Sequence, residues 1–211
     1  MAAIITEKFR IHNAEQFSES FSESSATTYY LTIGKPIAFT SDTSGGTDLS
    51  PPTPVDDVSS EYYAHDSMIA AKKITSSDIV RVIPRRNWAN STTFDMYEDN
   101  ISSSNTTTSG ATNLYDSTFY FMTSDFKVYK VLDNNGGTAF SGSEPTSTSN
   151  SPFESGGYIL KYMYTLTTSQ VQNFLTTDFM PVATDSTVST AAVDGKIESL
   201  IVTAGSGYTN G

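Results

Sequence analysis

Cysteine is absent from this 211-residue chain, and histidine occurs only at His12 and His65. Without thiols the chain forms neither disulfides nor thiolate metal sites, and it has no thiol for catalysis. Two histidines leave almost nothing for a His-based triad or a multi-histidine metal site. The lack of cysteine also fits a protein that is assembled in a reducing cytoplasm.

Charged residues are scarce as well, at 17% of the chain, against a typical value of about 25%. Acidic residues dominate, which gives a net charge of −11 and a pI near 4.4. Nucleic-acid binding requires Lys and Arg that neutralise phosphates, so this balance argues against a nucleic-acid partner. Ser and Thr make up more than a quarter of the residues, a composition that is frequent in β-rich adhesive and viral structural proteins.

Long hydrophobic runs are also missing, so no segment is predicted to insert into a membrane. Residues 1–8 have neither the basic start nor the apolar stretch of an export signal. The chain is nevertheless long enough to bury a core in one or two domains without disulfides or metals.

The N-terminal part predicts a strand on either side of a short helix. Residues 4–10 predict the first strand, and Asn13 and Gln16 have the spacing of a capping box that begins the helix. The apolar side chains of this helix fall on one face: Ala14, Phe17 and Phe21. A second strand, residues 29–34, alternates apolar and other residues and closes at a glycine.

A surface loop is predicted over residues 40–54, where Ser, Gly and Pro predominate. Residues 55–73 then predict an amphipathic helix, with aspartates at its start and lysines at its end, as the helix dipole favours. Glu61 and His65 lie one turn apart on this helix, which is a spacing that metal ligands use. Two or three ligands make a poor site, however, and a polar helix face is the favoured interpretation.

The middle of the chain predicts strands separated by polar segments. A strand over residues 79–83 stops at Pro84, whose nitrogen has no proton to donate. Residues 102–112 form a Ser/Thr/Asn tract that is expected to be either mobile or held by a neighbour. Residues 119–122 and 126–132 flank a three-residue turn, as in a β-hairpin.

After a second polar loop, residues 158–166 predict an aromatic strand. Five of its side chains are expected to share one core face: Tyr158, Leu160, Tyr162, Tyr164 and Leu166. Thr167 and Gln170 fit a capping box for a short helix, and residues 179–182 predict its return strand. A last strand at residues 197–203 lacks a partner, which comes either from another chain or from a continuation of this one.

Together these elements predict an α+β fold that is mainly β, with antiparallel sheets in sandwich-like layers, a few short helices and long polar loops. Residues 1–185 are expected to form one α+β region, which a polar linker near residues 92–113 divides. Residues 186–211 are expected to begin a Gly-rich β segment.

No catalytic, cofactor-binding or metal-binding residues are predicted. Neighbouring carboxylates such as Glu98 and Asp99 are a pattern used by glycosidases, but local pairs on loops are usually solvated. The turn at Gly205, Ser206 and Gly207 lacks the helix and the lysine that a phosphate loop needs. The chain is therefore not expected to be an enzyme.

One charged and aromatic segment stands out. It runs Val-Ile-Pro-Arg-Arg-Asn-Trp over residues 82–88 and contains the only tryptophan. Arginine pairs and tryptophan are common interaction anchors. Two interpretations of Arg85, Arg86 and Trp88 stay open: contacts between subunits, or anchors that satisfy carboxylates or strand carbonyls and seal the core.

This segment resembles the Ile-Pro-Arg-Arg-Asn/Asp-Trp signature of the dimeric baseplate wedge protein of T-even-type contractile-tailed phages. Other stretches are similar to the same family in the same order: residues 4–10, 30–35, 126–133 and 156–164. The resemblance covers residues 4–182, and five ordered matches are harder to reach by chance than one motif.

The resemblance implies a structural component of the baseplate wedge that mediates baseplate assembly and transmits the rearrangement that triggers contraction. It also implies other wedge proteins as partners, a homodimer, no cofactor, and a place in the virion after assembly in the host cytoplasm. Two rival interpretations stay open. One is a receptor-binding or fibre-associated module that contacts host glycans, and the other is a cell-wall hydrolase, which needs converging carboxylates with raised pKa.

Overall fold

The computed structural model of the chain describes residues 7–34, 46–53 and 57–182, and the single positions 38, 190, 193 and 197. Within this part the chain forms eight β-strands and a few short helices, and every pair of named strands is antiparallel. The predicted α+β, mainly β fold is therefore confirmed. The chain divides into two compact units, Met1–Ile79 and Val80–Gly211.

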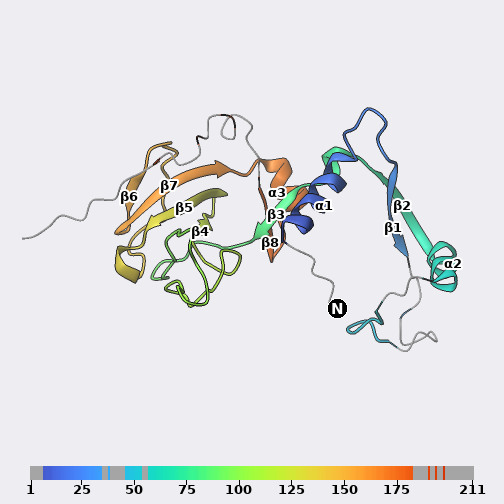
Figure 1. The fold of residues 1–211 in the computed structure, drawn as a ribbon, viewed down its shortest axis with the longest axis horizontal. Coiled ribbons are helices and arrows are strands. Elements are labelled where there is room, and N and C mark those ends of the chain that lie inside the picture. The colour runs from blue at the N-terminus through green and yellow to red at the C-terminus, as the bar shows by residue number, and fades with distance from the viewer. Residues whose placement is uncertain are drawn as a thin grey trace, which may run out of the picture. The chain divides into compact units, whose positions relative to one another are not determined.

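The first unit contains a two-stranded ribbon and two α-helices (Figure 1). Its elements are α1 (Glu7–Glu19), β1 (Tyr29–Gly34), α2 (Val58–Asp66), β2 (Met68–Ile74) and the 3₁₀ turn η2 (Ser76–Asp78). β1 and β2 pair antiparallel, with Tyr29 opposite Ile74. Just after α1, Phe21 is buried against Phe17 and Tyr29, whose ring centroids are 5.1 Å and 4.6 Å away. This aromatic cluster joins α1 to β1.

The structure corrects the predicted start of the chain. α1 begins at Glu7, so the strand predicted over residues 4–10 is wrong for residues 7–10, and residues 4–6 lie outside the described part. Asn13, the predicted N-cap, lies inside the helix. Good helix formers fill this segment, and a short alternation does not outweigh them. Phe21, which was predicted on the same helix face as Ala14 and Phe17, lies beyond the end of α1, although its ring contacts that of Phe17.

The long helix predicted over residues 55–73 is wrong beyond Asp66. Residues 68–74 form β2 instead, so Ile69 and the two lysines lie on a strand. Pairing with β1 decides the outcome, because a partner strand supplies backbone hydrogen bonds that a window of sequence does not reveal. Glu61 and His65 do lie on α2, and both are exposed.

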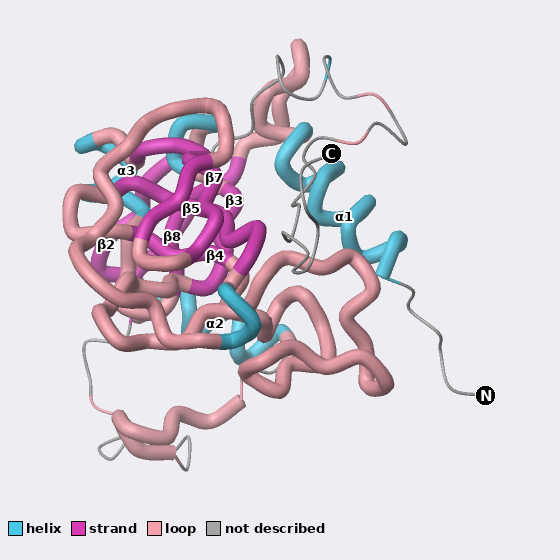
Figure 2. Tube along the Cα trace, turned by 90° about the vertical axis from the view of Figure 1, so that its left-hand side faces the viewer, coloured by secondary structure: helices cyan, strands magenta, loops and turns pink. Residues whose placement is uncertain are grey.

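The second unit is built on a four-stranded sheet with the strand order β4-β5-β7-β6 (Figure 1). A separate two-stranded sheet pairs β3 with β8, and α3 leads into β8. Figure 2 shows these strands gathered together with long loops around them. The bounds are β3 (Arg81–Pro84), β4 (Tyr120–Met122), β5 (Lys127–Asp133), η3 (Asn135–Gly137), β6 (Phe153–Ser155), β7 (Tyr158–Thr165), α3 (Thr168–Phe174) and β8 (Phe179–Val182).

Several predicted elements of this unit are confirmed. β3 ends at Pro84, and β4 and β5 form the predicted hairpin, with Phe121 opposite Tyr129. The capping box is present, because the Thr167 hydroxyl accepts from the backbone of Gln170 while the Gln170 side chain accepts from the backbone of Thr167. The return strand after α3 is β8, which pairs with β3. The strand predicted at residues 197–203 lies outside the described residues, except for position 197.

The sheet carries a hydrophobic core cluster on each face. The first cluster consists of Phe94, Phe121, Tyr129, Val131, Phe140, Tyr158 and Leu160. The second consists of Tyr120, Met122, Val128, Leu166 and Met180, with Ile83, Val171 and Leu175 packed against it. β3, β8 and α3 therefore cover part of the second face.

A β-bulge corrects the prediction that five residues of β7 share one face. Tyr162 lies opposite Tyr129, but Tyr164 lies opposite Val128, so Met163 is inserted between them without a partner. The extra residue turns the rest of the strand over. Tyr158 and Leu160 therefore pack in the first cluster, whereas Tyr164 packs against the second.

A buried carboxylate holds the Ser/Thr/Asn tract in place. Asp95, which is 1% exposed, accepts hydrogen bonds from the backbone and hydroxyl of Ser109, both 2.7 Å long. Its other partners are the Ser117 hydroxyl at 3.1 Å and the Thr118 nitrogen at 2.8 Å. Burial alone raises the pKa of Asp95, but hydrogen bonds from Thr118 and Ser109 outweigh it and keep the pKa below its ordinary value. The Ser/Thr/Asn tract was predicted to be either mobile or held by a neighbour, and in the structure Asp95 holds it through Ser109.

The division predicted near residues 92–113 stays a prediction. Those residues lie inside the second unit, to whose interior they contribute Phe94 and Asp95. The predicted segment 186–211 lies outside the described residues, apart from three single positions.

Candidate interaction site

The segment that carries Arg85, Arg86 and Trp88 covers one edge of the four-stranded sheet. Met122 of β4 donates its backbone N–H to the Arg86 carbonyl at 2.7 Å, and Trp88 donates to the Met122 carbonyl at 2.8 Å. Asn87 and Met122 form a parallel bridge. The exit from β3 thus satisfies backbone groups that an open edge would expose.

Arg85 ties this segment to the turn before β8. Its backbone N–H donates to the Asp178 carbonyl at 2.7 Å, and its guanidinium Nη1 donates to the Thr176 carbonyl at 2.9 Å. Nε donates to the side chain of Asn87 at 3.0 Å. Arg85 therefore joins two stretches that are far apart in the sequence.

Arg86 holds a different loop. Its Nη2 donates to the carbonyls of Tyr115 and Asp116 at 3.0 Å and 2.9 Å. The guanidinium carbon lies 5.8 Å from the centroid of the Tyr120 ring, a cation–π distance. Burial raises the pKa of Tyr120, although Arg86 opposes that shift. The Tyr120 hydroxyl in turn donates to the Pro84 carbonyl at 2.8 Å, which closes the cluster.

Trp88 packs against the first core cluster, and its ring meets that of Phe140 edge-on at 5.8 Å. Two buried nitrogens, Nε of Arg86 and Nε1 of Trp88, have no hydrogen-bond partner among the described residues. The contacts of the three anchor residues are to backbone carbonyls, to aromatic rings and to one amide. The structure thus brings the predicted site residues together in one segment, but each points to a different neighbour.

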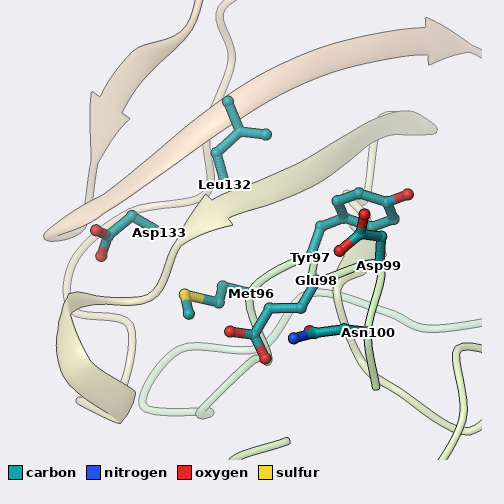
Figure 3. A pocket seen from close by; sticks show the side chains of 7 residues that line it. All are labelled: Met96, Tyr97, Glu98, Asp99, Asn100, Leu132 and Asp133. Carbon is teal, nitrogen blue, oxygen red and sulfur yellow. The ribbon is translucent and has the colours of Figure 1, made fainter. Parts of the chain in front are cut away.

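An open hollow of about 580 Å³ lies beside β5. It is lined by Met96, Tyr97, Glu98, Asp99, Asn100, Leu132 and Asp133 (Figure 3). The three carboxylates point in different directions in Figure 3. Among the residues that the structure describes, no group of three or more His, Cys, Asp or Glu side chains is placed to hold a metal ion. The arrangement therefore lacks the converging carboxylates that hydrolysis of a polymer needs.

Residues 3–141, which are more than half of the chain, match the family described as Phage-Gp8: Bacteriophage T4, Gp8. The chain belongs to the Gp8 family. This confirms the resemblance to baseplate wedge proteins of T-even-type phages, and it identifies a structural component of the phage baseplate. No curated protein matches the chain.

The part that matches the Gp8 family contains the first unit from residue 3 onward, the Arg85–Trp88 segment, β4 and β5. Within the described residues, no helix has both the length and the apolar character that crossing a membrane requires.

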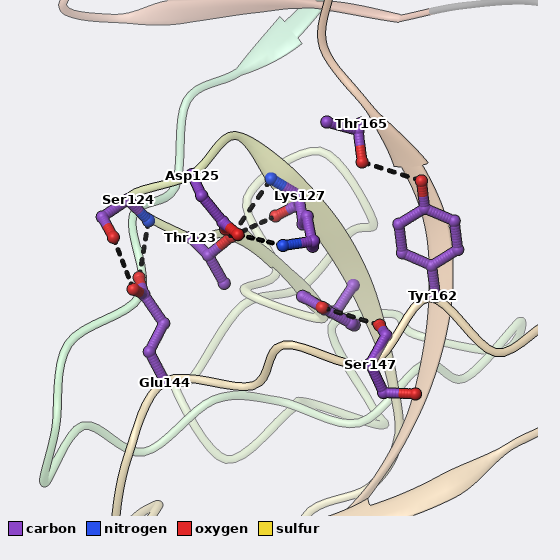
Figure 4. A network of polar contacts seen from close by, with 9 residues as sticks. Thr123, Ser124, Asp125, Lys127, Glu144, Ser147, Tyr162 and Thr165 are labelled. Atoms are coloured by element: carbon purple, nitrogen blue, oxygen red, sulfur yellow. Dashed lines mark hydrogen bonds and ion pairs between the residues drawn. The ribbon is translucent and has the colours of Figure 1, made fainter.

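A polar network pins a long loop of this Gp8-family chain to the β4–β5 turn (Figure 4). The Glu144 carboxylate accepts from the backbone and the hydroxyl of Ser124, at 2.6 Å and 2.5 Å. The buried Tyr129 donates its hydroxyl to the Ser147 carbonyl at 2.8 Å. Within the turn, Lys127 forms an ion pair with Asp125. The loop predicted as polar and irregular therefore has fixed attachment points.

Sequence reasoning missed one charged feature of the sheet. Lys130 on β5 and Lys161 on β7 lie directly opposite each other, and the Lys130 ammonium lies 3.4 Å from the centroid of the Tyr97 ring. Alternation within each strand suggests which side chains share a face, but only the register between the strands brings these two lysines together.

Proposed function

We propose that this chain is a structural subunit of the baseplate wedge that joins neighbouring wedge proteins, acts as a homodimer, and transmits the rearrangement that triggers sheath contraction. Membership of the Gp8 family, with its match over residues 3–141, is the observation that carries the proposal. Assembly in the host cytoplasm is part of it, and the absence of cysteine agrees with that compartment.

The exposed apolar side chains of the first unit support this role. Tyr30, Leu31, Ile33 and Ile69 on β1 and β2 are between 57% and 64% exposed. A two-stranded ribbon is marginally stable on its own in water. Large exposed apolar side chains in such a ribbon are typical of proteins that bury surface within an assembly.

The second unit supports the mechanical side of the proposal. Its sheet has a core cluster on both faces, and its loops are tied down by Arg85, Arg86, Asp95 and Glu144. A unit with so many long-range attachments moves as one body. The internal contacts of Arg85, Arg86 and Trp88 favour the role of anchors within this unit over contacts between subunits.

Electron microscopy of intact and contracted particles with a gold-labelled antibody against this chain tests the assignment. We expect label on the baseplate in both states, and analytical ultracentrifugation of the purified chain should give a dimer. Label along the fibres, or only on tips bound to the host, would overturn the proposal in favour of the receptor-binding module. A monomer at all accessible concentrations would remove the homodimer.

A further inference from the structure

The strand β1 has an open edge. In the described part of the chain β1 pairs only with β2, so no strand lies on its other side (Figure 1). Tyr29, at one end of β1, packs into the aromatic cluster with Phe17 and Phe21. The open part of β1 is therefore residues 30–34, and all five are exposed. An edge of this kind is a template for the addition of another strand.

β1 lacks the features with which proteins block an exposed edge. Its sequence, Tyr-Tyr-Leu-Thr-Ile-Gly, contains neither a charged residue nor a proline. β2, by contrast, carries Lys72 and Lys73, and Ile69 is an extra residue in its pairing with β1. Lysines and bulges both discourage an edge strand from pairing with another chain. Of the two edges of the ribbon, the β1 edge is therefore the one that suits a further strand.

The open part of β1 is complementary to itself. Its centre is Thr32, so an antiparallel pair about a two-fold axis there puts Thr32 opposite the same residue of a second copy. Leu31 then lies opposite Ile33 of the partner subunit, and the four aliphatic side chains share one face. Tyr30 lies opposite Gly34 of the partner subunit, where the missing side chain leaves room for the ring.

Charge also favours a contact between two copies at this edge. With a net charge of −11, two copies repel each other over most of their surfaces, but β1 is neutral. In a sheet of order β2-β1-β1-β2, the two β2 strands are three strand spacings apart, about 14 Å. This separation exceeds the Debye length of about 8 Å at physiological salt, so the lysines of the two β2 strands are screened from each other. A contact between the two β2 edges would instead bring these lysines together.

We propose that β1 pairs antiparallel with β1 of a second copy of this chain, about a two-fold axis at Thr32, and that this contact is the homodimer interface. The inference rests on the proposed function, because it names the surface through which that homodimer forms. Among the residues described in the first unit, Phe21 is the only buried hydrophobic one. A four-stranded sheet with an apolar face gives this unit a stability that a two-stranded ribbon lacks.

The absence of cysteine allows a direct test, because an introduced cysteine is then the only thiol in each chain. Thr32→Cys places two thiols opposite each other at the axis, where Cα atoms about 4.5–5.5 Å apart lie within the range of a disulfide. Ala71→Cys is the matched control, because Ala71 is also exposed and lies opposite Thr32 on β2. After oxidation of the purified full chain with diamide, we expect Thr32→Cys to form a covalent dimer on a non-reducing denaturing gel. Ala71→Cys should remain monomeric on the same gel.

Leu31→Glu tests the same contact without a thiol. Inside the ribbon the new carboxylate lies opposite Lys72, so it brings no like-charge pair to the β1–β2 pairing. Across the two-fold axis it lies about 7–8 Å from the carboxylate of the second copy. We expect dimerisation to weaken by about tenfold in analytical ultracentrifugation. Leu49→Glu is the control, because Leu49 is exposed in the same unit but outside the ribbon, and it should dimerise like the wild type.

The failures of the two proposals are distinguishable. A wild-type dimer without a disulfide in Thr32→Cys overturns the β1 interface alone, and so does equal or stronger cross-linking of Ala71→Cys. A wild-type chain that stays monomeric removes the proposed homodimer together with its interface. If Thr32→Cys cross-links but gold label is absent from the baseplates, the β1 interface stands and the proposed place in the wedge fails.

Discussion

Replacing the buried carboxylate of Asp95 with an amide tests how the Ser/Thr/Asn tract is held. In Asp95→Asn one carboxylate oxygen becomes an NH₂ group. At the position of Oδ1 this group faces the backbone N–H of Ser109, and at the position of Oδ2 it faces the hydroxyls of Ser109 and Ser117 and the backbone N–H of Thr118. At least one buried N–H or O–H then loses its acceptor, which costs about 1–3 kcal/mol, and the remaining bonds lose their charge. We expect the free energy of unfolding to fall by about 3 kcal/mol.

Chemical denaturation followed by tryptophan fluorescence measures this loss, since Trp88 packs in the same unit as Asp95. Asp116→Asn is the matched control, because Asp116 is exposed, and it should cost less than about 0.5 kcal/mol. Hydrogen exchange should show faster exchange at Ser109 and its neighbours in Asp95→Asn. An Asp95→Asn stability within about 0.5 kcal/mol of the wild type would refute the reasoning.

The pH dependence of the same carboxylate gives an independent check. The folded-state pKa of Asp95 is lowered, so its contribution to stability is fully present above the ordinary aspartate pKa. The contribution is lost as the pH falls from the ordinary value through the lowered one, because over that range the unfolded state binds the proton more readily than the folded state does. Wild-type stability should therefore fall more steeply in acid than that of Asp95→Asn.

Three further outcomes are expected. Arg86→Lys should destabilise the chain by about 1–2 kcal/mol in urea unfolding, because an ammonium does not reproduce both the two hydrogen bonds from Nη2 and the contact of the planar guanidinium with the Tyr120 ring. Gly156→Ala should prevent the second unit from folding stably, since its Cβ would lie 2.3 Å from the core ring of Phe140. Gly110→Ala is the control, because Gly110 also has a positive φ but lies in open space, and it should lower the free energy of unfolding by only about 1 kcal/mol. Equal melting temperatures for the two variants would contradict this prediction. An NMR titration should place the pKa of Asp78 at about 2, chiefly because Lys72 donates to it, and Lys72→Gln should raise that pKa.

The elements that sequence reasoning found carry local signals. Pro84 ends β3 because its nitrogen cannot continue a ladder, and the Thr167–Gln170 capping box begins α3 through contacts three residues apart. The β4–β5 hairpin needs only a short turn between two apolar runs. Each of these signals lies within a few residues of the structure that it fixes.

The elements that it missed depend on partners far along the chain. Residues 68–74 become a strand because β1 lies beside them, although their own pattern suits the end of a helix. The Ser/Thr/Asn tract has too few apolar residues to fold alone, and one aspartate outside it holds it. In both cases tertiary contacts outweigh local preference.

The candidate site shows the same division: the sequence indicates which kinds of group the site residues contact, but not where along the chain those groups lie. Backbone carbonyls were among the partners predicted for the arginines. The sequence did not predict that Arg86 donates to the carbonyls of Tyr115 and Asp116, which lie about thirty positions away. The pairing of Lys130 with Lys161 depends on register still more directly. In a regular strand, Lys161 and Tyr164 are three residues apart and point to opposite faces. The bulge at Met163 puts both on the second face, beside the core cluster that β3, β8 and α3 cover. Because of the single inserted residue, Met163, the two lysines lie beside the second core cluster. No pattern in the sequence of β7 indicates the position of this bulge.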